Sequence, residues 1–333
     1  MLISSRGIEP EQPLEEDIMK LRGIDFGNVL GASGVQGFFG EGYWFHRLWR
    51  PFGLDLSDLT FVAKTATMWP RSGNMALKKN FEPRNLFPSC VKVKPWRGLV
   101  LNAVGLSNPG LLALLARESW QKRTKPFWLS LMPMGNTANE RLEELRTMVN
   151  LIGLEKENFS APFGLQINLS CPNTNHDPGQ LIEESDAMLN VAGTLGVPLM
   201  LKFSIASAPI EAVAALNDHA MCDAICVSNT LPFGWQGIDW QNVWGGTTSP
   251  LAEFGGGGLS GGVLRPLVCK WMVSLRKAGF TKPINGGGGI LCADDVDAFN
   301  RAGASSIFIG SVAMVRPWRV KSIIKQANKL DWR

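Results

Sequence analysis

The stretch FGLQINLSCPN, residues 163–173, decides how this chain of 333 residues is interpreted. It begins as an apolar run with the length of a buried strand and ends in a loop that holds Cys171 between Asn168 and Asn173. Pro172 biases Cys171 away from helical dihedral angles, which predicts that the strand breaks at the thiol. A thiol beside two carboxamides suits proton transfer to or from a neutral, polar ring.

Cys171 fits a metal site poorly, because no second Cys or His stands at the spacing of metal ligands. The simpler alternative is a small buried hydrophobic residue in a turn. The flanking Asn residues and the other motifs of the chain favour the catalytic interpretation. We therefore expect no metal, and we treat Cys171 as the candidate catalytic residue.

Composition excludes several classes of protein. A hydrophobic content of 45% and a charged content of 19% describe a folded globular protein with a large core. The net charge of +4 comes from scattered Lys and Arg, so no nucleic acid partner is expected. Six cysteines without a C-x-x-C pair, and no signal peptide, predict a reducing, cytoplasmic compartment. No run of 18 apolar residues predicts a transmembrane segment.

Eight apolar runs recur along the chain, and most are followed by amphipathic, helix-like segments. This alternation predicts βαβ units and a parallel sheet, and eight such strands predict a closed (β/α)8 TIM barrel. The expected strands are 27–33, 59–65, 126–131, 163–170, 197–203, 223–229, 282–287 and 305–310. The expected helices are 139–151, 181–195, 209–217, 262–278 and 293–302.

Two insertions elaborate the predicted barrel. A ninth apolar run, 99–104, precedes a candidate helix at 111–122 and is assigned to an insertion after the second strand. The Gly-rich segment 231–261 is assigned to an insertion after the sixth strand. Acidic residues without apolar periodicity predict an N-terminal arm over 1–23. No linker divides the remainder, so 24–333 is expected to form one barrel domain.

Polar residues or glycines close each expected strand. In a parallel barrel all carboxyl ends meet at one face, where active sites are built. A single Lys or Asn at a strand end is usually structural, but a full ring of such residues is not easily explained that way. The closing residues include Ser33, Lys64, Thr65, Ser130, Asn168, Ser170, Lys202, Ser228, Asn229, Thr230, Gly288, Gly289, Gly310 and Ser311.

The types of these residues predict a ligand that carries phosphate and negative charge. Glycines after the seventh and eighth strands let backbone N–H groups approach a phosphate without a Cβ in the way. Lys202 ends a strongly apolar strand and needs a negative partner, for which an anionic reduced flavin would serve. Lys64 repeats the argument, and a lysine snorkelling at the barrel rim is the alternative. Carboxamides can read the edge of a planar ring, although single Asn residues are usually turn formers.

Taken together, these motifs resemble those of the dihydroorotate dehydrogenase family, in the family's order, from about residue 27 to residue 318. Each motif alone is weak, and their combination is specific. The matching pieces are 31–35, Lys64-Thr65, Asn102 with Gly105-Leu106, 168–173, Lys202, 228–230, 257–262, 286–290 and 309–311.

The resemblance implies an FMN-dependent oxidation of dihydroorotate to orotate in pyrimidine biosynthesis. Cys171 falls where the soluble classes of the family carry a cysteine base, which removes a proton from C5 while C6 passes hydride to flavin N5. The positions that match substrate-binding residues are Asn102, Gly105, Leu106, Asn168, Asn173, Asn229 and Thr230. Those that match flavin-binding residues are Ala32, Ser33, Lys64, Thr65, Ser130, Asn168, Lys202, Ser228, Gly261, Gly288, Gly289, Gly310 and Ser311. A homodimer is expected.

Several alternatives stay open at this point. A related FMN oxidoreductase acting on another dihydropyrimidine or cyclic enone would carry similar residues. A tRNA-dihydrouridine synthase-like enzyme is disfavoured by the different Cys motif, and a non-catalytic barrel by the intact Cys, Lys and Asn set. The electron acceptor is left open between fumarate, NAD through an iron–sulfur partner subunit, and a quinone.

Three segments depart from the family pattern, and one of them is 75–95, a stretch with many basic residues where the family usually shows a compact Pro-rich segment. The aromatic segment 37–54 is longer than expected after the first strand and is interpreted as a packing or dimer element, with a membrane-touching helix as the alternative. The loop after Asn173 contains His176, which is a second candidate base or a solvated loop residue.

Overall fold

The computed structural model describes residues 19–169 and 178–332. Cys171, Asn173, Ser170 and His176 therefore lie outside the described residues, and their predicted roles stay predictions.

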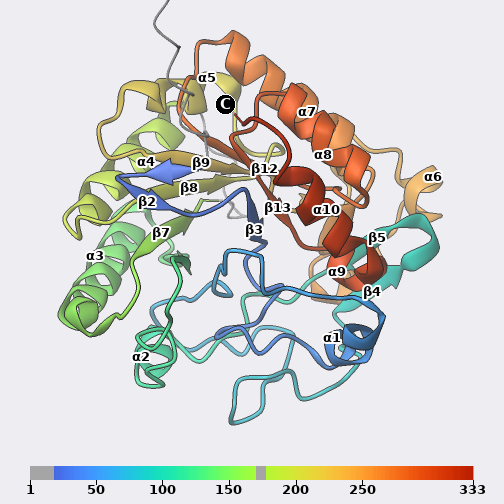
Figure 1. Ribbon diagram of the computed structural model, residues 1–333, viewed down its shortest axis with the longest axis horizontal. Helices are drawn as coiled ribbons and strands as arrows, with labels where there is room; N and C mark the ends of the chain where they lie inside the picture. The colour runs from blue at the N-terminus through green and yellow to red at the C-terminus, as the bar shows by residue number, and fades with distance from the viewer. Residues whose placement is uncertain (1–18, 170–177, 333) are drawn as a thin grey trace, which may run out of the picture.

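A curled sheet of seven parallel strands occupies the centre of the molecule, in the order β3-β13-β12-β9-β8-β7-β6 (Figure 1). Every residue of these strands is buried, so the strands read as nearly continuous apolar runs. They are β3 (Val29–Gly31), β6 (Phe127–Leu131), β7 (Phe163–Asn168), β8 (Leu199–Phe203), β9 (Ala224–Val227), β12 (Ile284–Gly287) and β13 (Ser306–Ile309).

Residues 60–66 join the two edges of this sheet. Thr60 forms a parallel bridge with Leu30 of β3, while Val62 bridges to Trp128 of β6. A further parallel bridge links Ala66 to β6. The expected second strand is thus present as a series of bridges rather than as a regular strand. The mixed α/β, TIM-barrel-like architecture predicted from the sequence is confirmed.

Helices cover the outer face of the sheet in Figure 1. The longest, α3, begins with a capping box between Thr137 and Glu140. It buries Leu145, Met148, Val149 and Ile152, which recur at helical spacing. The covering helices are α3 (Ala138–Glu155), α4 (Pro178–Gly193), α5 (Ile210–Ala214), α7 (Leu264–Lys277), α8 (Ala293–Arg301) and α10 (Val320–Ala327).

Two expected helices are shorter than the sequence indicated. The helix expected over 111–122 is only α2 (Leu111–Leu115), and Glu118 just beyond it has a φ of 54°, in the left-handed region that ends a helix. The helix expected over 209–217 is α5 followed by a 3-10 turn at Ala215–Asp218. The remaining short helices are α1 (Trp44–Trp49), α6 (Trp240–Trp244) and α9 (Val312–Val315).

A second, four-stranded antiparallel sheet lies beside the barrel in the order β10-β11-β5-β4. Its strands are β4 (Val91–Lys94), β5 (Leu99–Asn102), β10 (Leu231–Pro232) and β11 (Gly258–Gly261). β4 and β5 come from the chain between residues 60–66 and β6, and β10 and β11 from the chain between β9 and β12. The ninth apolar run of the sequence is β5.

The amino-terminal hairpin plugs the interior of the barrel. It comprises β1 (Lys20–Leu21) and β2 (Ile24–Asp25). Met19 and Leu21 are buried in one cluster with Trp128, Met200 and Phe308, which come from three different barrel strands. Residues 19–23, which the sequence analysis placed in an N-terminal arm, therefore pack against the barrel.

Candidate active site at the carboxyl ends of the barrel strands

Six candidate site residues each follow, two positions later in the sequence, a residue of the buried cluster in the barrel interior. This cluster contains Leu30, Val62, Trp128, Met200, Cys226 and Phe308. Side chains alternate along a strand with a period of two, so the residue two places on shares the inward face. The successors are Ala32, Lys64, Ser130, Lys202, Ser228 and Gly310. Six predicted site residues therefore belong to one layer at the carboxyl ends.

A chain of hydroxyl groups connects three strands of this layer. The Ser33 hydroxyl is 2.8 Å from the Thr65 hydroxyl, which is 3.0 Å from that of Ser130. Ser33 also donates to the Ala63 carbonyl at 3.0 Å. The three hydroxyls can rotate to donate or accept, so they can match the polar edge of a bound ring.

Asn168, Lys202 and Asn229 form a second group. Asn168 pairs in register with Lys202 across β7 and β8, and the Asn229 amide lies 3.4 Å from the Asn168 Oδ1. Asn229 Oδ1 accepts the Thr230 N–H at 2.9 Å. Lys202 is only 6% exposed, and burial lowers the pKa of its ammonium group. A negatively charged ligand at this position would stabilise the charged form.

Lys64 is held at the edge of the same layer. Its ammonium group donates to the Ser107 carbonyl and lies 4.5 Å from the centroid of the Phe38 ring. Burial lowers the pKa of Lys64 to about 8, although Glu41 and Cys90 oppose the shift. Ser107 was not among the predicted site residues, although it directly follows Gly105 and Leu106 of the family motif. Its position next to this motif is the sequence feature that could have identified it.

Asn102 and Thr230 meet around Gly258. The Asn102 amide lies 3.4 Å from the Gly258 carbonyl, and a Cβ built on Gly258 would stand 2.2 Å from the Thr230 hydroxyl oxygen. Gly105 and Leu106 follow at the end of β5, both with positive φ. The antiparallel sheet therefore places Asn102 beside Gly258, which in turn lies next to Thr230, and the substrate-binding role of both side chains stays a prediction.

Several glycines near the starts of α7 and α9 lie very close to neighbouring atoms of the protein. A Cβ on Gly261 would stand 2.0 Å from the Gly98 carbonyl oxygen, and a Cβ on Gly289 would stand 2.8 Å from the backbone N of Arg265. A Cβ on Gly310 would stand 2.9 Å from that of Ala32. Gly288 has a φ of 109°, and Ser311 directly precedes α9. These close contacts and positive φ angles explain why glycine is favoured at Gly261, Gly288, Gly289 and Gly310.

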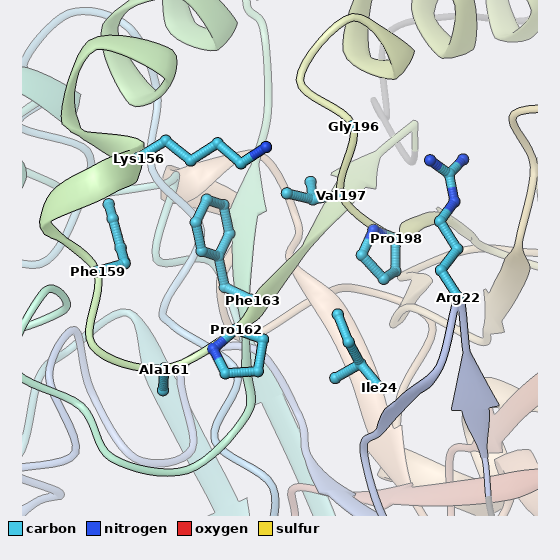
Figure 2. Close-up of a pocket in the computed structure, with 10 residues that line it drawn as sticks. All are labelled: Arg22, Ile24, Lys156, Phe159, Ala161, Pro162, Phe163, Gly196, Val197 and Pro198. Atoms are coloured by element: carbon cyan, nitrogen blue, oxygen red, sulfur yellow. The ribbon is translucent and has the colours of Figure 1, made fainter.

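A separate small cavity lies at the other end of the barrel (Figure 2). It is lined by Phe163 and Pro198, at the amino ends of β7 and β8, and has a volume of about 220 Å³. Two cations flank it, but Lys156 donates to the Leu195 carbonyl at 2.8 Å and Arg22 is paired with Asp223 at 2.9 Å. This cavity offers no group that is free for chemistry.

Within the described parts of the chain, no group of three or more His, Cys, Asp or Glu side chains is arranged to hold a metal ion. Among the same residues, no helix is both long and apolar enough to cross a bilayer.

Known proteins to which this chain is similar include dihydroorotate dehydrogenases. A family model for dihydroorotate dehydrogenase matches residues 18–330. A Listeria monocytogenes protein named dihydroorotate dehydrogenase B (NAD(+)), catalytic subunit, is 30% identical over 322 residues, covering 93% of this chain and 92% of that protein. A Bacillus cereus protein of the same name is 29% identical over 326 residues, covering 94% and 91%.

The fold is also shared with solved structures. A DHODH from Eimeria tenella, in complex with ferulenol, matches with a TM-score of 0.64 at 18% identity. The match covers 94% of this chain and 85% of that one. At this level of identity the likeness supports the TIM-barrel-like fold alone.

Proposed function

The chain belongs to the dihydroorotate dehydrogenase family, and we propose that it binds FMN and oxidises dihydroorotate to orotate in pyrimidine biosynthesis, with Cys171 as the base. The observation that carries this proposal is the inward layer at the carboxyl ends of the strands, where hydroxyls, two lysines and carboxamides from separate strands gather.

The described residues fit a flavin mononucleotide. Gly261, Gly288, Gly289, Gly310 and Ser311 would hold the phosphate through backbone N–H groups, where a side chain could not be accommodated. Ala32, Ser33, Thr65, Ser130 and Ser228 would line the ring system, with Lys64 and Lys202 supplying positive charge. A bound flavin supplies the hydride acceptor of the reaction.

The substrate would be held by carboxamides and one hydroxyl. Asn102, Asn168, Asn229 and Thr230 are linked by hydrogen bonds or by contact through Gly258, so they can present donors and acceptors from a fixed frame. Asn173 would complete this set, together with the backbone at Gly105 and Leu106. The role of these side chains is to orient the ring so that its C5 proton faces the thiol.

Cys171 would act as the base in its thiolate form. A free thiol has a pKa near ~8.5, so only a fraction is ionised at neutral pH unless its surroundings assist. The proton of C5 then passes to the sulfur atom while hydride leaves from C6. His176 is the alternative base.

The route of the electrons beyond the flavin is a separate proposal. Similar proteins are named catalytic subunits of an NAD(+)-linked enzyme, and on that ground we propose NAD+, reached through a partner subunit, as the acceptor. These names do not support the homodimer expected from the resemblance. A cytoplasmic location also stays a prediction.

The decisive experiment is an anaerobic titration of the purified yellow protein with dihydroorotate, dihydrouracil and dihydrothymine. We expect dihydroorotate alone to bleach the flavin absorbance. Bleaching by dihydrouracil or dihydrothymine instead would assign the chain to another dihydropyrimidine, and a colourless protein that binds no added FMN would refute the proposal. Mixing the reduced protein with fumarate, and with NAD+ alone, then tests the acceptor: rapid reoxidation by fumarate would contradict the NAD+ route.

A further inference from the structure

A pocket of about 550 Å³ lies outside the candidate active site, between α1, the loop at 53–57 and the first turn of α10. Its volume is within the range of pockets that hold small organic ligands. Its wall includes His46, Arg50, Leu54, Asp55, Leu56 and Lys321.

Two cations reach this pocket from different elements. Arg50 directly follows α1, and Lys321 lies in the first turn of α10, more than 250 residues later in the chain. Neither forms an ion pair with a carboxylate in the described parts of the chain. The fold therefore brings together two positive charges that a bound anion could bridge.

His46 lines the pocket as an uncharged ring. It is 3% exposed, and its Nδ1 accepts the Tyr43 N–H at 3.3 Å, which places the ring proton on Nε2. Burial, together with the charge of Arg50, lowers the pKa of His46 to about 4. The ring is therefore neutral at physiological pH and adds no positive charge to the pocket wall.

Asp55 would determine the orientation of a ligand in the pocket. Its carboxylate accepts the Ser57 N–H at 2.8 Å, and this bond, followed by the nearby charges of Lys321 and Arg50, lowers the pKa of Asp55. The carboxylate would repel a second negative charge on the ligand and accept a hydrogen bond from a hydroxyl. Leu54 and Leu56 supply apolar surface between the charged groups.

We propose that this pocket binds a small organic anion, with its carboxylate or phosphate between Arg50 and Lys321 and a hydroxyl toward Asp55. The site is distinct from the proposed flavin and substrate positions, and only its test makes use of the proposed flavin binding. Because both cations are exposed to solvent, we expect dissociation constants in the millimolar range for simple probes.

The test is calorimetric titration of the holoenzyme with inorganic phosphate, succinate and glycerol 3-phosphate. Bound flavin keeps phosphate out of the glycine cradle at Gly289 and Gly310. We expect Arg50→Gln and Lys321→Gln each to weaken binding by about tenfold or more, as the loss of a charge-assisted contact requires. Lys325→Gln is the matched control, since Lys325 is exposed on the same helix but does not line the pocket, and its binding should match that of the wild type.

The probes also identify the chemistry of the ligand. Tighter binding of glycerol 3-phosphate than of succinate would assign a phosphate ester, and the reverse order a carboxylate. Absence of binding by all three probes to the wild-type protein would overturn the proposal. Equal binding by wild type, Arg50→Gln and Lys321→Gln would also overturn it, and would place the anion elsewhere, whether or not the enzyme oxidises dihydroorotate.

Discussion

Lys64 and Lys202 are the residues in which burial and charge conflict most clearly. Each is an inward-facing lysine near the carboxyl end of its strand, and for each the largest influence on the pKa is burial, which lowers it. A buried ammonium group is unfavourable unless a negative group faces it. An anionic ligand beside these two side chains would favour their charged forms.

Cys171 is the residue on which turnover should depend most strongly. We expect Cys171→Ala to reduce the rate of flavin reduction by dihydroorotate by at least about 100-fold while FMN stays bound, since a positioned base contributes about 10²–10⁴-fold. Cys171→Ser should keep partial activity, with its optimum at higher pH. In the wild type, stopped-flow rates should rise from roughly pH 6 toward pH 9 as the thiolate forms. An unchanged rate in Cys171→Ala would transfer the role to another group, and His176→Asn is the matching variant.

Lys64 should make the stability of the flavin-free protein depend on pH. Its pKa is about 8 in the folded state against 10.5 in the unfolded chain, so between these values the unfolded state binds more protons. The free energy of unfolding of the wild type should therefore rise with pH across this window, relative to that of Lys64→Met, by at most about 3 kcal/mol. Urea denaturation of both proteins at pH 7.5 to 10 measures the difference. Parallel curves would show that Lys64 is not desolvated.

At the scale of elements, close backbone contacts between loops shape the site as much as side chains do. β11 pairs with β5, and its last residue, Gly261, approaches the Gly98 carbonyl so closely that only glycine fits. The Gly-rich segment could be placed at a strand end from the sequence, because glycine runs and strand ends are both visible there. The backbone that Gly261 contacts, at Gly98, could not be predicted, because it lies more than 150 residues earlier in the chain.

Gly261→Ala should disrupt this contact. The new Cβ would stand 2.0 Å from the Gly98 carbonyl oxygen, and Gly261 has a φ of 121°, which other residues rarely adopt. We expect a loss of about 2–5 kcal/mol in the free energy of unfolding and weaker retention of flavin on gel filtration. Gly246→Ala is the control, because nothing lies within 4 Å of a Cβ there. Equal effects of the two variants would contradict the steric argument.

A buried ion pair fastens α3 to α4. The Arg141 guanidinium contacts the Glu184 carboxylate through two hydrogen bonds of 2.5 and 2.7 Å, and both side chains are nearly buried. Arg141→Met should destabilise the protein by about 3–5 kcal/mol, because it leaves a buried carboxylate without its cation. The double variant Arg141→Met with Glu184→Met should recover most of this loss. Thermal unfolding of the wild type, Arg141→Met and the double variant measures these differences in stability. A double variant that is no more stable than Arg141→Met would contradict this account.

At the scale of the whole molecule, the sequence predicted the barrel because the relevant patterns are local. Apolar runs, their polar ends and the glycines after the last strands can all be read within a few residues. Features that depend on distant contacts were not visible: the hairpin at Met19 and Leu21 inside the barrel, Ser107 at the ammonium group of Lys64, and the early end of α2. The proposed role of the Cys171 thiol rests on its sequence motif alone, because this residue lies outside the described parts of the chain.

Buried thiols should set the alkaline limit of stability. Burial raises the pKa of Cys222 and Cys226 to about 12 and that of Cys269 to about 11. Above pH 9 the unfolded chain loses these protons first, so the free energy of unfolding should fall as pH rises. Cys222→Ala should reduce this loss by about 1.4 kcal/mol per pH unit, measured by urea denaturation between pH 9 and 10.5. An identical slope in the variant would contradict the assignment.

The segment at 60–66 closes the ring of strands with isolated bridges, and it also carries Lys64 and Thr65. The part of the barrel with the sparsest strand pairing thus also carries two of the proposed flavin-binding residues. A flavin held as we propose by Lys64 and Thr65 would therefore also stabilise the sparse contacts between residues 60–66 and the two edge strands, β3 and β6.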